Sequence, residues 1–148
     1  MMEGNNIHPT VIIEGDLKIG RGNTIGAYTI LKGNIKIGDN NFIGPHCVLQ
    51  NNIEIGQFNR LEAFVALGAL GEMGAKGDVF LPEGKIIIGD GTTLREYVNV
   101  HSPVRRSNTH IGNKCYIMNK CYIAHDCQIG DNVMMSALTK FEIGRAHV

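Results

Sequence analysis

The sequence predicts an all-β solenoid with a triangular coil, and three observations support this fold. The first is that Ile or Leu occupies every sixth position from Ile7 to Leu67, and the same spacing returns over 88–100 and 111–135. A helix repeats near 3.6 residues and a strand near 2, so a sustained period of six indicates neither element alone. Six residues to a side and about 18 to a turn predict short strands that bury their inner face only by stacking coil upon coil.

The second observation is the position of glycine. If Ile7 lies on side A of the triangle, Ile13 on side B and Ile19 on side C, every inward residue of side C is followed by glycine. These six residues are Ile19, Ile37, Ile55, Ile88, Ile111 and Ile129. Glycine suits a corner that needs an open or positive-φ backbone. Because the pairs continue beyond both interruptions of the repeat, we expect one continuous solenoid domain over residues 1–141.

The third observation is that both interruptions leave the repeat from side B. We expect loop excursions at about 68–87 and 101–110, and one coil later side B contains the segment 123–127, Ile-Ala-His-Asp-Cys. Loops gathered on one face of a solenoid usually mark its binding face. His125 is the histidine placed beside both excursions, and His101 lies one coil below it. We therefore expect these two histidines to line a cleft on side B.

Composition narrows the class of protein. The chain has 148 residues, with 14 basic and 14 acidic side chains, which argues against a nucleic-acid binder. No apolar run approaches the ~18 residues of a membrane span, and residues 1–6 are too short and polar for a signal peptide. The four cysteines occupy the fifth place of their hexads, as small inward residues, and free thiols at this density favour a reducing, cytoplasmic compartment.

The chain resembles a known family in these same segments. Residues 7–10 (Ile-His-Pro-Thr), Leu94-Arg95-Glu96 and above all 123–127 are similar to the acyl-ACP–UDP-N-acetylglucosamine O-acyltransferases of lipid A synthesis, within the hexapeptide-repeat superfamily. The resemblance covers residues 7 to about 141. It implies a left-handed parallel β-helix, a homotrimer with active sites between subunits, and no cofactor. The implied partners are acyl carrier protein and a UDP-sugar.

The resemblance also implies roles for individual residues. His125 would be the general base and Asp126 its assistant, since imidazole titrates near neutrality and a carboxylate can fix its tautomer. Neighbouring strand residues point to opposite faces, so Asp126 reaches His125 only if the corner bends it round. Tyr122 stands where a second active-site histidine is expected, and the first excursion offers Glu72 and Lys76. We expect His101, Tyr122, Glu72 and Lys76 to bind substrate.

The end of the chain leaves the repeat. The next side C corner is due at 147, whereas Ile143-Gly144 comes early, and codons for 142–148 can match a sequencing-library adapter. We expect a non-native tail at 142–148 on a C-terminally truncated fragment, which would not catalyse on its own. Acyl-chain length and the choice of oxygen or nitrogen acceptor stay open at this point.

Three other functions fit parts of the pattern. Another hexapeptide-repeat sugar O- or N-acyltransferase would share the solenoid with a different acceptor. A γ-carbonic-anhydrase-like protein needs three histidines around zinc, of which His101 and His125 could supply two. A non-catalytic β-solenoid would give no reason for the excursions on side B.

Overall fold

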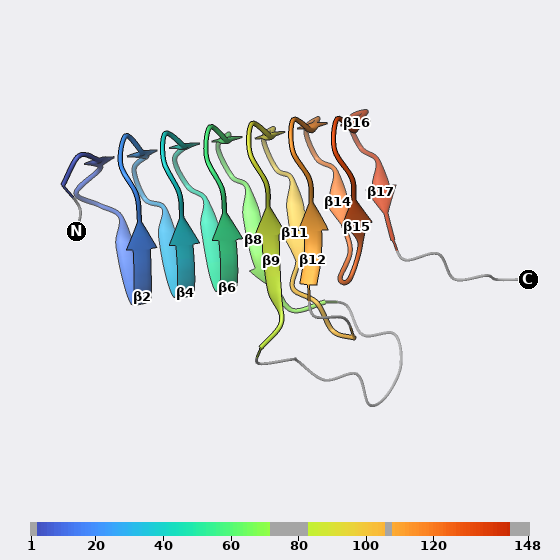
Figure 1. Ribbon diagram of the computed structural model, residues 1–148, viewed down its shortest axis with the longest axis horizontal. Coiled ribbons are helices and arrows are strands. Elements are labelled where there is room, and N and C mark those ends of the chain that lie inside the picture. Colours follow the sequence, from blue (N-terminus) through green and yellow to red (C-terminus); the bar gives the residue numbers. More distant parts are fainter. Residues whose placement is uncertain (1–2, 72–82, 106–107, 143–148) are drawn as a thin grey trace, which may run out of the picture.

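A computed structural model describes residues 3–71, 83–105 and 108–142, and in these ranges the chain forms a parallel β-solenoid without helices (Figure 1). Coils of the described residues follow one another in a single row in sequence order, each built from short strands and turns. Within the described residues, no helical segment has the length and apolar character needed to cross a bilayer.

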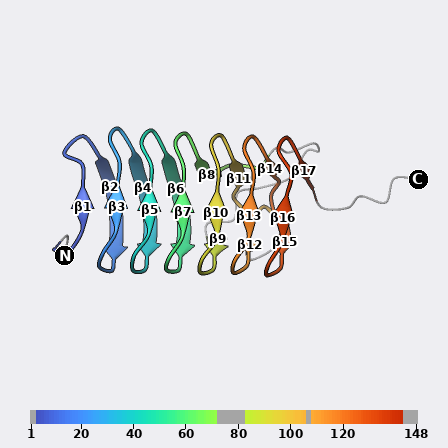
Figure 2. The same cartoon turned by 90° about the horizontal axis from the view of Figure 1, so that it is seen from above.

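Side A is a sheet of seven two-residue strands, all parallel (Figure 2). Its members in spatial order are β1 (Asn6–Ile7), β3 (Thr24–Ile25), β5 (Phe42–Ile43), β7 (Arg60–Leu61), β10 (Thr93–Leu94), β13 (Tyr116–Ile117) and β16 (Met134–Met135). Ile7 pairs with Ile25 and Ile25 with Ile43, so inward aliphatic residues stack directly over one another. The predicted register of side A is confirmed.

Sides B and C form one sheet because the early strands run across both. These strands are β2 (Ile12–Ile19), β4 (Ile30–Ile37) and β6 (Val48–Ile55). The later coils use separate strands: β8 (Ala66–Ala69), β11 (Asn99–His101), β14 (Tyr122–Ile123) and β17 (Lys140–Phe141) on side B, and β9 (Lys85–Ile88), β12 (Asn108–Ile111) and β15 (Gln128–Ile129) on side C. The two halves of β6 pair with β8 and with β9, which joins the two sides.

The bend between sides B and C depends on residues with a left-handed backbone. Gly15 has φ +99°, Gly33 has φ +116° and Asn51 has φ +70°. A Cβ on Gly33 would lie 2.4 Å from the carbonyl oxygen of Asn51, closer than a side chain can approach. Glycine therefore supplies both the backbone angle and the space between coils at this bend.

Inward aliphatic residues of all three sides form the core. Leu49, Leu67 and Ile123 are fully buried, as are most of the other inward positions. The terminal coils lack a neighbour on one side, so Ile13 remains 37% exposed and Phe141 39% exposed. The four cysteines are buried and free, which confirms their prediction as small inward residues.

Hydrogen bonds between neighbouring coils also locate where the repeat is lengthened. Thr92 bonds to a residue 33 positions before it and Cys115 to one 23 positions before it, whereas Asn41 bonds back over the regular 18. Both long intervals fall where the excursions are expected, but 72–82 and 106–107 lie outside the described residues. The excursions and the boundary at residue 141 therefore stay predictions, as does the non-native tail over 142–148, of which 143–148 also lie outside the described residues.

Candidate active site

His125 and Asp126 occupy the turn between β14 and β15, and the backbone there brings their side chains together. Asp126 has φ +67°, a left-handed conformation that an extended strand does not contain. The imidazole Nδ1 of His125 lies 2.6 Å from Oδ2 of Asp126. The side chain of His125 is 12% exposed and that of Asp126 is fully buried. The corner therefore provides the contact that alternation along a strand would prevent.

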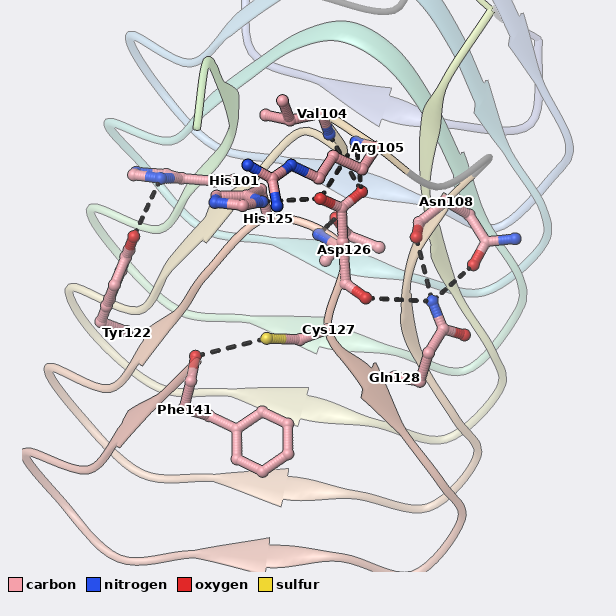
Figure 3. A network of polar contacts seen from close by, with 11 residues as sticks. His101, Val104, Arg105, Asn108, Tyr122, His125, Asp126, Cys127, Gln128 and Phe141 are labelled. Carbon is pink, nitrogen blue, oxygen red and sulfur yellow. Dashed lines mark hydrogen bonds and ion pairs between the residues drawn. The ribbon is translucent and has the colours of Figure 1, made fainter. Parts of the chain in front are cut away.

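The Asp126 carboxylate also binds the segment after β11. Its Oδ1 accepts hydrogen bonds from the backbone N–H groups of Val104 and Arg105, both at 3.0 Å, and Arg105 reaches Oδ2 at 3.1 Å. Behind it, the backbone N–H of Asp126 donates to Oγ1 of the buried Thr109 over 2.9 Å. Figure 3 shows Val104 and Arg105 grouped around the carboxylate beside His125. Asp126 thus joins the candidate base to the second predicted excursion.

These contacts assign the proton of the neutral imidazole. An ionised carboxylate can only accept hydrogen bonds, so Nδ1 of His125 must be the donor in the bond to Asp126. The lone pair of neutral His125 then lies on Nε2. A histidine in this tautomer can accept a proton from a hydroxyl group held in front of Nε2.

The segments that begin the two predicted excursions are hydrogen-bonded to each other. The backbone N–H of Ser102 donates to the carbonyl of Ala69, and its hydroxyl donates to the carbonyl of Gly68, each over 2.9 Å. Ser102 is buried. Both predicted excursions therefore start from positions that are fixed to side B, on the same edge as His125.

His101 and Tyr122 form a second polar pair on side B. His101 is buried at the end of β11, and its Nδ1 lies 3.2 Å from the hydroxyl of Tyr122 in the next coil. The two rings meet edge to face, with centroids 4.9 Å apart. Nδ2 of Asn99 lies 3.3 Å from Nε2 of His101, while Oδ1 of the same amide is buried and has no partner among the described residues. Tyr122 therefore supplies a hydroxyl to His101 at the position where a histidine was expected.

The structure brings four of the six predicted site residues to one edge of the solenoid, in two pairs. His125 and Asp126 are neighbours in one coil, and Tyr122 of that coil contacts His101 of the coil before it. The other two, Glu72 and Lys76, lie outside the described residues. The anchoring residues Thr109 and Asn99 were not predicted. Thr109 occupies the fifth place of a hexad, where a small residue is ordinary, so the sequence contains no signal that its hydroxyl would support Asp126.

A separate cleft lies on the corner between sides A and B. It measures about 450 Å³ and is lined by residues that include Arg95, Glu96, Tyr97, Tyr116 and Lys120. The Arg95 guanidinium donates to the Tyr116 hydroxyl at 2.7 Å and to Glu96 at 2.9 Å, and these bonds, the first above all, raise the pKa of Arg95. The pKa of Glu96 is lowered, first by a hydrogen bond from its own backbone N–H and then by the hydrogen bond from Arg95. His125 is not among the residues that line this cleft.

Zinc chemistry finds little support in the described part of the chain. No group of three or more His, Cys, Asp or Glu side chains is placed there to hold a metal ion. His101 is bonded to Tyr122, and His125 is bonded to Asp126. A zinc site at these histidines would therefore need ligands from outside the described residues of this chain.

Comparison with known proteins agrees with the resemblance found in the sequence. The bacterial transferase hexapeptide (six repeats) family matches residues 108–139. A curated relative, the acyl-[acyl-carrier-protein]–UDP-N-acetylglucosamine O-acyltransferase of Syntrophobacter fumaroxidans, is 39% identical over 80 residues, which cover 53% of this chain and 30% of the relative. Over these segments the chain is thus similar to hexapeptide-repeat acyltransferases.

Two solved structures extend this similarity over most of the chain. The UDP-N-acetylglucosamine O-acyltransferase of Moraxella catarrhalis RH4 is 31% identical, with a TM-score of 0.76 over 84% of this chain and 48% of that one. The UDP-N-acetylglucosamine acyltransferase of Campylobacter jejuni is 27% identical, with a TM-score of 0.77 over 92% of this chain and 54% of that one. This chain therefore spans about half the length of these structures, and less of the curated relative.

Proposed function

Starting from this relationship to the UDP-N-acetylglucosamine acyltransferases, we propose that the chain is part of an enzyme that acylates a UDP-amino-sugar. The donor is a (3-hydroxy)acyl group on acyl carrier protein, and the acceptor is UDP-N-acetylglucosamine or a close analogue. The curated relative is named for this donor and acceptor, which supports the proposal. The transfer requires no cofactor.

The observation that supports the chemistry most directly is the bond between His125 and Asp126. A sugar hydroxyl has too high a pKa to attack a thioester unaided at neutral pH. Nε2 of His125 accepts the hydroxyl proton as the new C–O bond forms, and general base catalysis of this kind typically contributes 10²- to 10⁴-fold. The C–S bond then breaks, and the imidazolium returns the proton to the leaving thiolate. Asp126 stabilises the imidazolium while charge develops on the ring.

Substrate binding is assigned to the residues around this base. His101 and Tyr122 are a bonded pair in neighbouring coils of side B, with ring nitrogen and hydroxyl groups that suit a sugar. Glu72 and Lys76, from the first excursion, complete the proposed acceptor site. Left-handed winding, a homotrimer with sites between subunits and a cytoplasmic location also belong to this proposal, because the family resemblance implies them.

A related acyltransferase with a different acceptor is the second candidate. The hexapeptide family match specifies neither the acceptor nor the atom that is acylated. An amine acceptor would use the same base at His125, with the proton taken from nitrogen. The acceptor is therefore the part of the proposal that an assay must decide.

The proposal is tested by mass spectrometry of the acceptor after incubation with acyl carrier protein thioesters. The complete product of the source gene is used, and UDP-N-acetylglucosamine is compared with its 3-amino analogue and with a non-nucleotide amino sugar. Acylation of a UDP-sugar by the carrier-protein donor is the expected result. Acylation of only the non-nucleotide sugar would favour the second candidate, and no transfer to any acceptor would overturn both.

A further inference from the structure

Gly71 lies against the ring of the candidate base. It follows β8 at the start of the first predicted excursion, and its Cα faces both His125 and Val104. A Cβ built on Gly71 would lie 2.8 Å from Cβ of His125, 2.9 Å from Cδ2 of the same ring and 2.8 Å from Cγ2 of Val104. Carbon atoms in proteins do not pack this closely, so a side chain at position 71 would require a neighbouring group to move.

The groups around Gly71 have little freedom to move aside. His125 is bonded through Nδ1 to Asp126, and Asp126 is held by backbone N–H groups of Val104 and Arg105. Val104 itself is 6% exposed. The ring is therefore enclosed by Asp126 at its Nδ1 edge, by Gly71 at its Cδ2 edge and by the Val104 side chain nearby.

We infer that Gly71 is a positioning residue for the general base. Its bare Cα closes against the imidazole and keeps Nδ1 of His125 on the Asp126 carboxylate, which leaves Nε2 as the proton acceptor. This inference rests on the proposed role of His125, but the contact itself can be measured without any reaction. The gap between position 71 and the ring of His125 has room for a glycine but not for a methyl group. An alanine at position 71 must therefore displace either the imidazole ring or the segment that contains position 71.

The tautomer of His125 in solution provides the first test. Long-range ¹⁵N–¹H correlation spectra distinguish the two ring nitrogens, and His125→Ala assigns the signals. In the wild type we expect Nδ1 protonated, and a nuclear Overhauser effect between the Hα protons of Gly71 and Hδ2 of His125. In Gly71→Ala the ring turns away from Asp126, and its two tautomers mix. Gly130→Ala is the matched control, because among the described residues a Cβ there meets nothing within 4 Å.

Steady-state kinetics provide the second test. Gly71→Ala should lower kcat by about tenfold or more with little change in the KM for the sugar, because small displacements of a reacting group cost rate rather than binding. Gly71→Ala combined with Val104→Ala removes one of the two obstructions and should recover part of the loss. A merely structural role for Gly71 would lower the amount of folded protein and leave kcat per folded molecule unchanged.

The outcomes separate this inference from the proposed function. Wild-type spectra without the Gly71–His125 proximity would overturn the inference, even if Gly71→Ala does not fold. An unchanged tautomer in a folded Gly71→Ala would overturn it as well, since the loop would then have moved in place of the ring. A changed tautomer in a protein that transfers no acyl group would support the contact and reject the proposed function.

Discussion

At the scale of single residues, the Asp126 carboxylate has two functions that one substitution can separate. It accepts a hydrogen bond from the imidazole of His125, and it accepts hydrogen bonds from the backbone N–H groups of Val104 and Arg105. The first bond fixes the tautomer of His125, the proposed base, and the second holds the segment beside it. The left-handed backbone of Asp126 makes both possible, and asparagine tolerates this conformation almost as well as aspartate does.

Asp126→Asn should therefore preserve the fold and lower the rate. The amide oxygen can still accept from the loop, but the amide NH₂ then faces Nδ1 of His125 and favours the tautomer protonated on Nε2. We expect kcat to fall, but by less than in His125→Ala, because the imidazole stays in place although it is held in the wrong tautomer. Thermal unfolding and kcat are measured on the same preparation. A full rate in Asp126→Asn would show that the carboxylate does not set the tautomer.

The buried thiol of Cys47 gives a pH dependence of stability. Burial raises the pKa of Cys47 from its ordinary value of about 9 to about 11, with Sγ donating to the carbonyl of Glu62 over 3.1 Å. Because of the raised pKa, the Cys47 thiol keeps its proton in the folded state, whereas in the unfolded state the same thiol loses its proton above about pH 9. The contribution to stability is thus complete below about pH 9 and is lost as the pH rises toward 11.

Cys47→Ser should abolish this part of the alkaline decline. The free energy of unfolding is measured by urea titration between pH 8 and about 10.5, and the difference between pH values is compared with that of the wild type. The expected result is a smaller decline in Cys47→Ser, whatever its stability at pH 8. Equal declines would mean that the Cys47 thiol ionises alike in both states.

At the scale of elements, the sequence predicted which residues stack but not why each corner needs its residue. The register of Ile19, Ile37 and Ile55 is confirmed, because inward aliphatic residues follow the strand period directly. Glycine was expected after these residues for an open or positive-φ backbone. Gly38 in fact has no positive φ, and its lack of a side chain admits the carbonyl of Gly56, which a Cβ would meet at 2.5 Å.

Positive φ angles occur instead at aromatic residues, where the six-residue pattern did not predict them. Tyr28, His46, Phe64 and Tyr97 all adopt left-handed backbones at the corner between sides A and B. Their rings stack in one row, with centroids 5.0 to 5.3 Å apart. Each such backbone costs roughly 1 kcal/mol, and ring stacking between coils offsets part of that cost. Sequence periodicity cannot reveal this, because the stacking exists only between coils 18 or more residues apart.

Substitution of two glycines tests the account of the corners. Gly33→Ala places a methyl group at φ +116° and 2.4 Å from a carbonyl oxygen, so we expect a loss of stability of about 2 kcal/mol or more. In Gly130→Ala the new Cβ meets nothing within 4 Å in the described part of the chain, so stability should change by less than about 0.5 kcal/mol. Urea denaturation measures both. Equal losses would contradict a role for inter-coil space at the bend.

At the scale of the whole molecule, the solenoid is a stack in which each coil contacts only its neighbours. Buried asparagines illustrate this order: the Asn41 side chain donates to Oδ1 of Asn23, and Oδ1 of Asn41 accepts from the backbone of Asn59 in the next coil. Such a ladder requires each corner to lie over the equivalent corner. Stability in a stack of this kind is approximately a sum over neighbouring coils.

Removing a complete coil should therefore be tolerated where removing part of one is not. Deletion of residues 26–43 joins Ile25 to Gly44 and leaves every later residue on its own side. Deletion of 26–37 keeps the period of six but moves Asn41 to another corner, away from Asn23. We expect the first variant to unfold cooperatively in a circular dichroism melt and the second to lose that transition. Similar melts for both would mean that the period alone, without the side-specific residues, determines the stack.

The site was predictable only in part, because some of its contacts depend on how whole coils stack. His125 and Asp126 are adjacent in sequence, and the repeat placed them beside both interruptions, so the pair could be proposed from the sequence. Their support by Thr109 and Val104 comes from the preceding coil, across 17 and 22 residues. Contacts at these separations depend on how the lengthened coils return to the stack, which periodicity does not describe.

The central claim is that His125 is the base of an acyl transfer, and one measurement tests it most directly. Rates of acyl transfer from acyl carrier protein to UDP-N-acetylglucosamine are compared for the wild type, His125→Ala and the exposed control His8→Ala, in the complete gene product. We expect His125→Ala to lower kcat by about 10²-fold or more with little change in KM, and His8→Ala to match the wild type. Equal rates for the wild type and His125→Ala would contradict the claim.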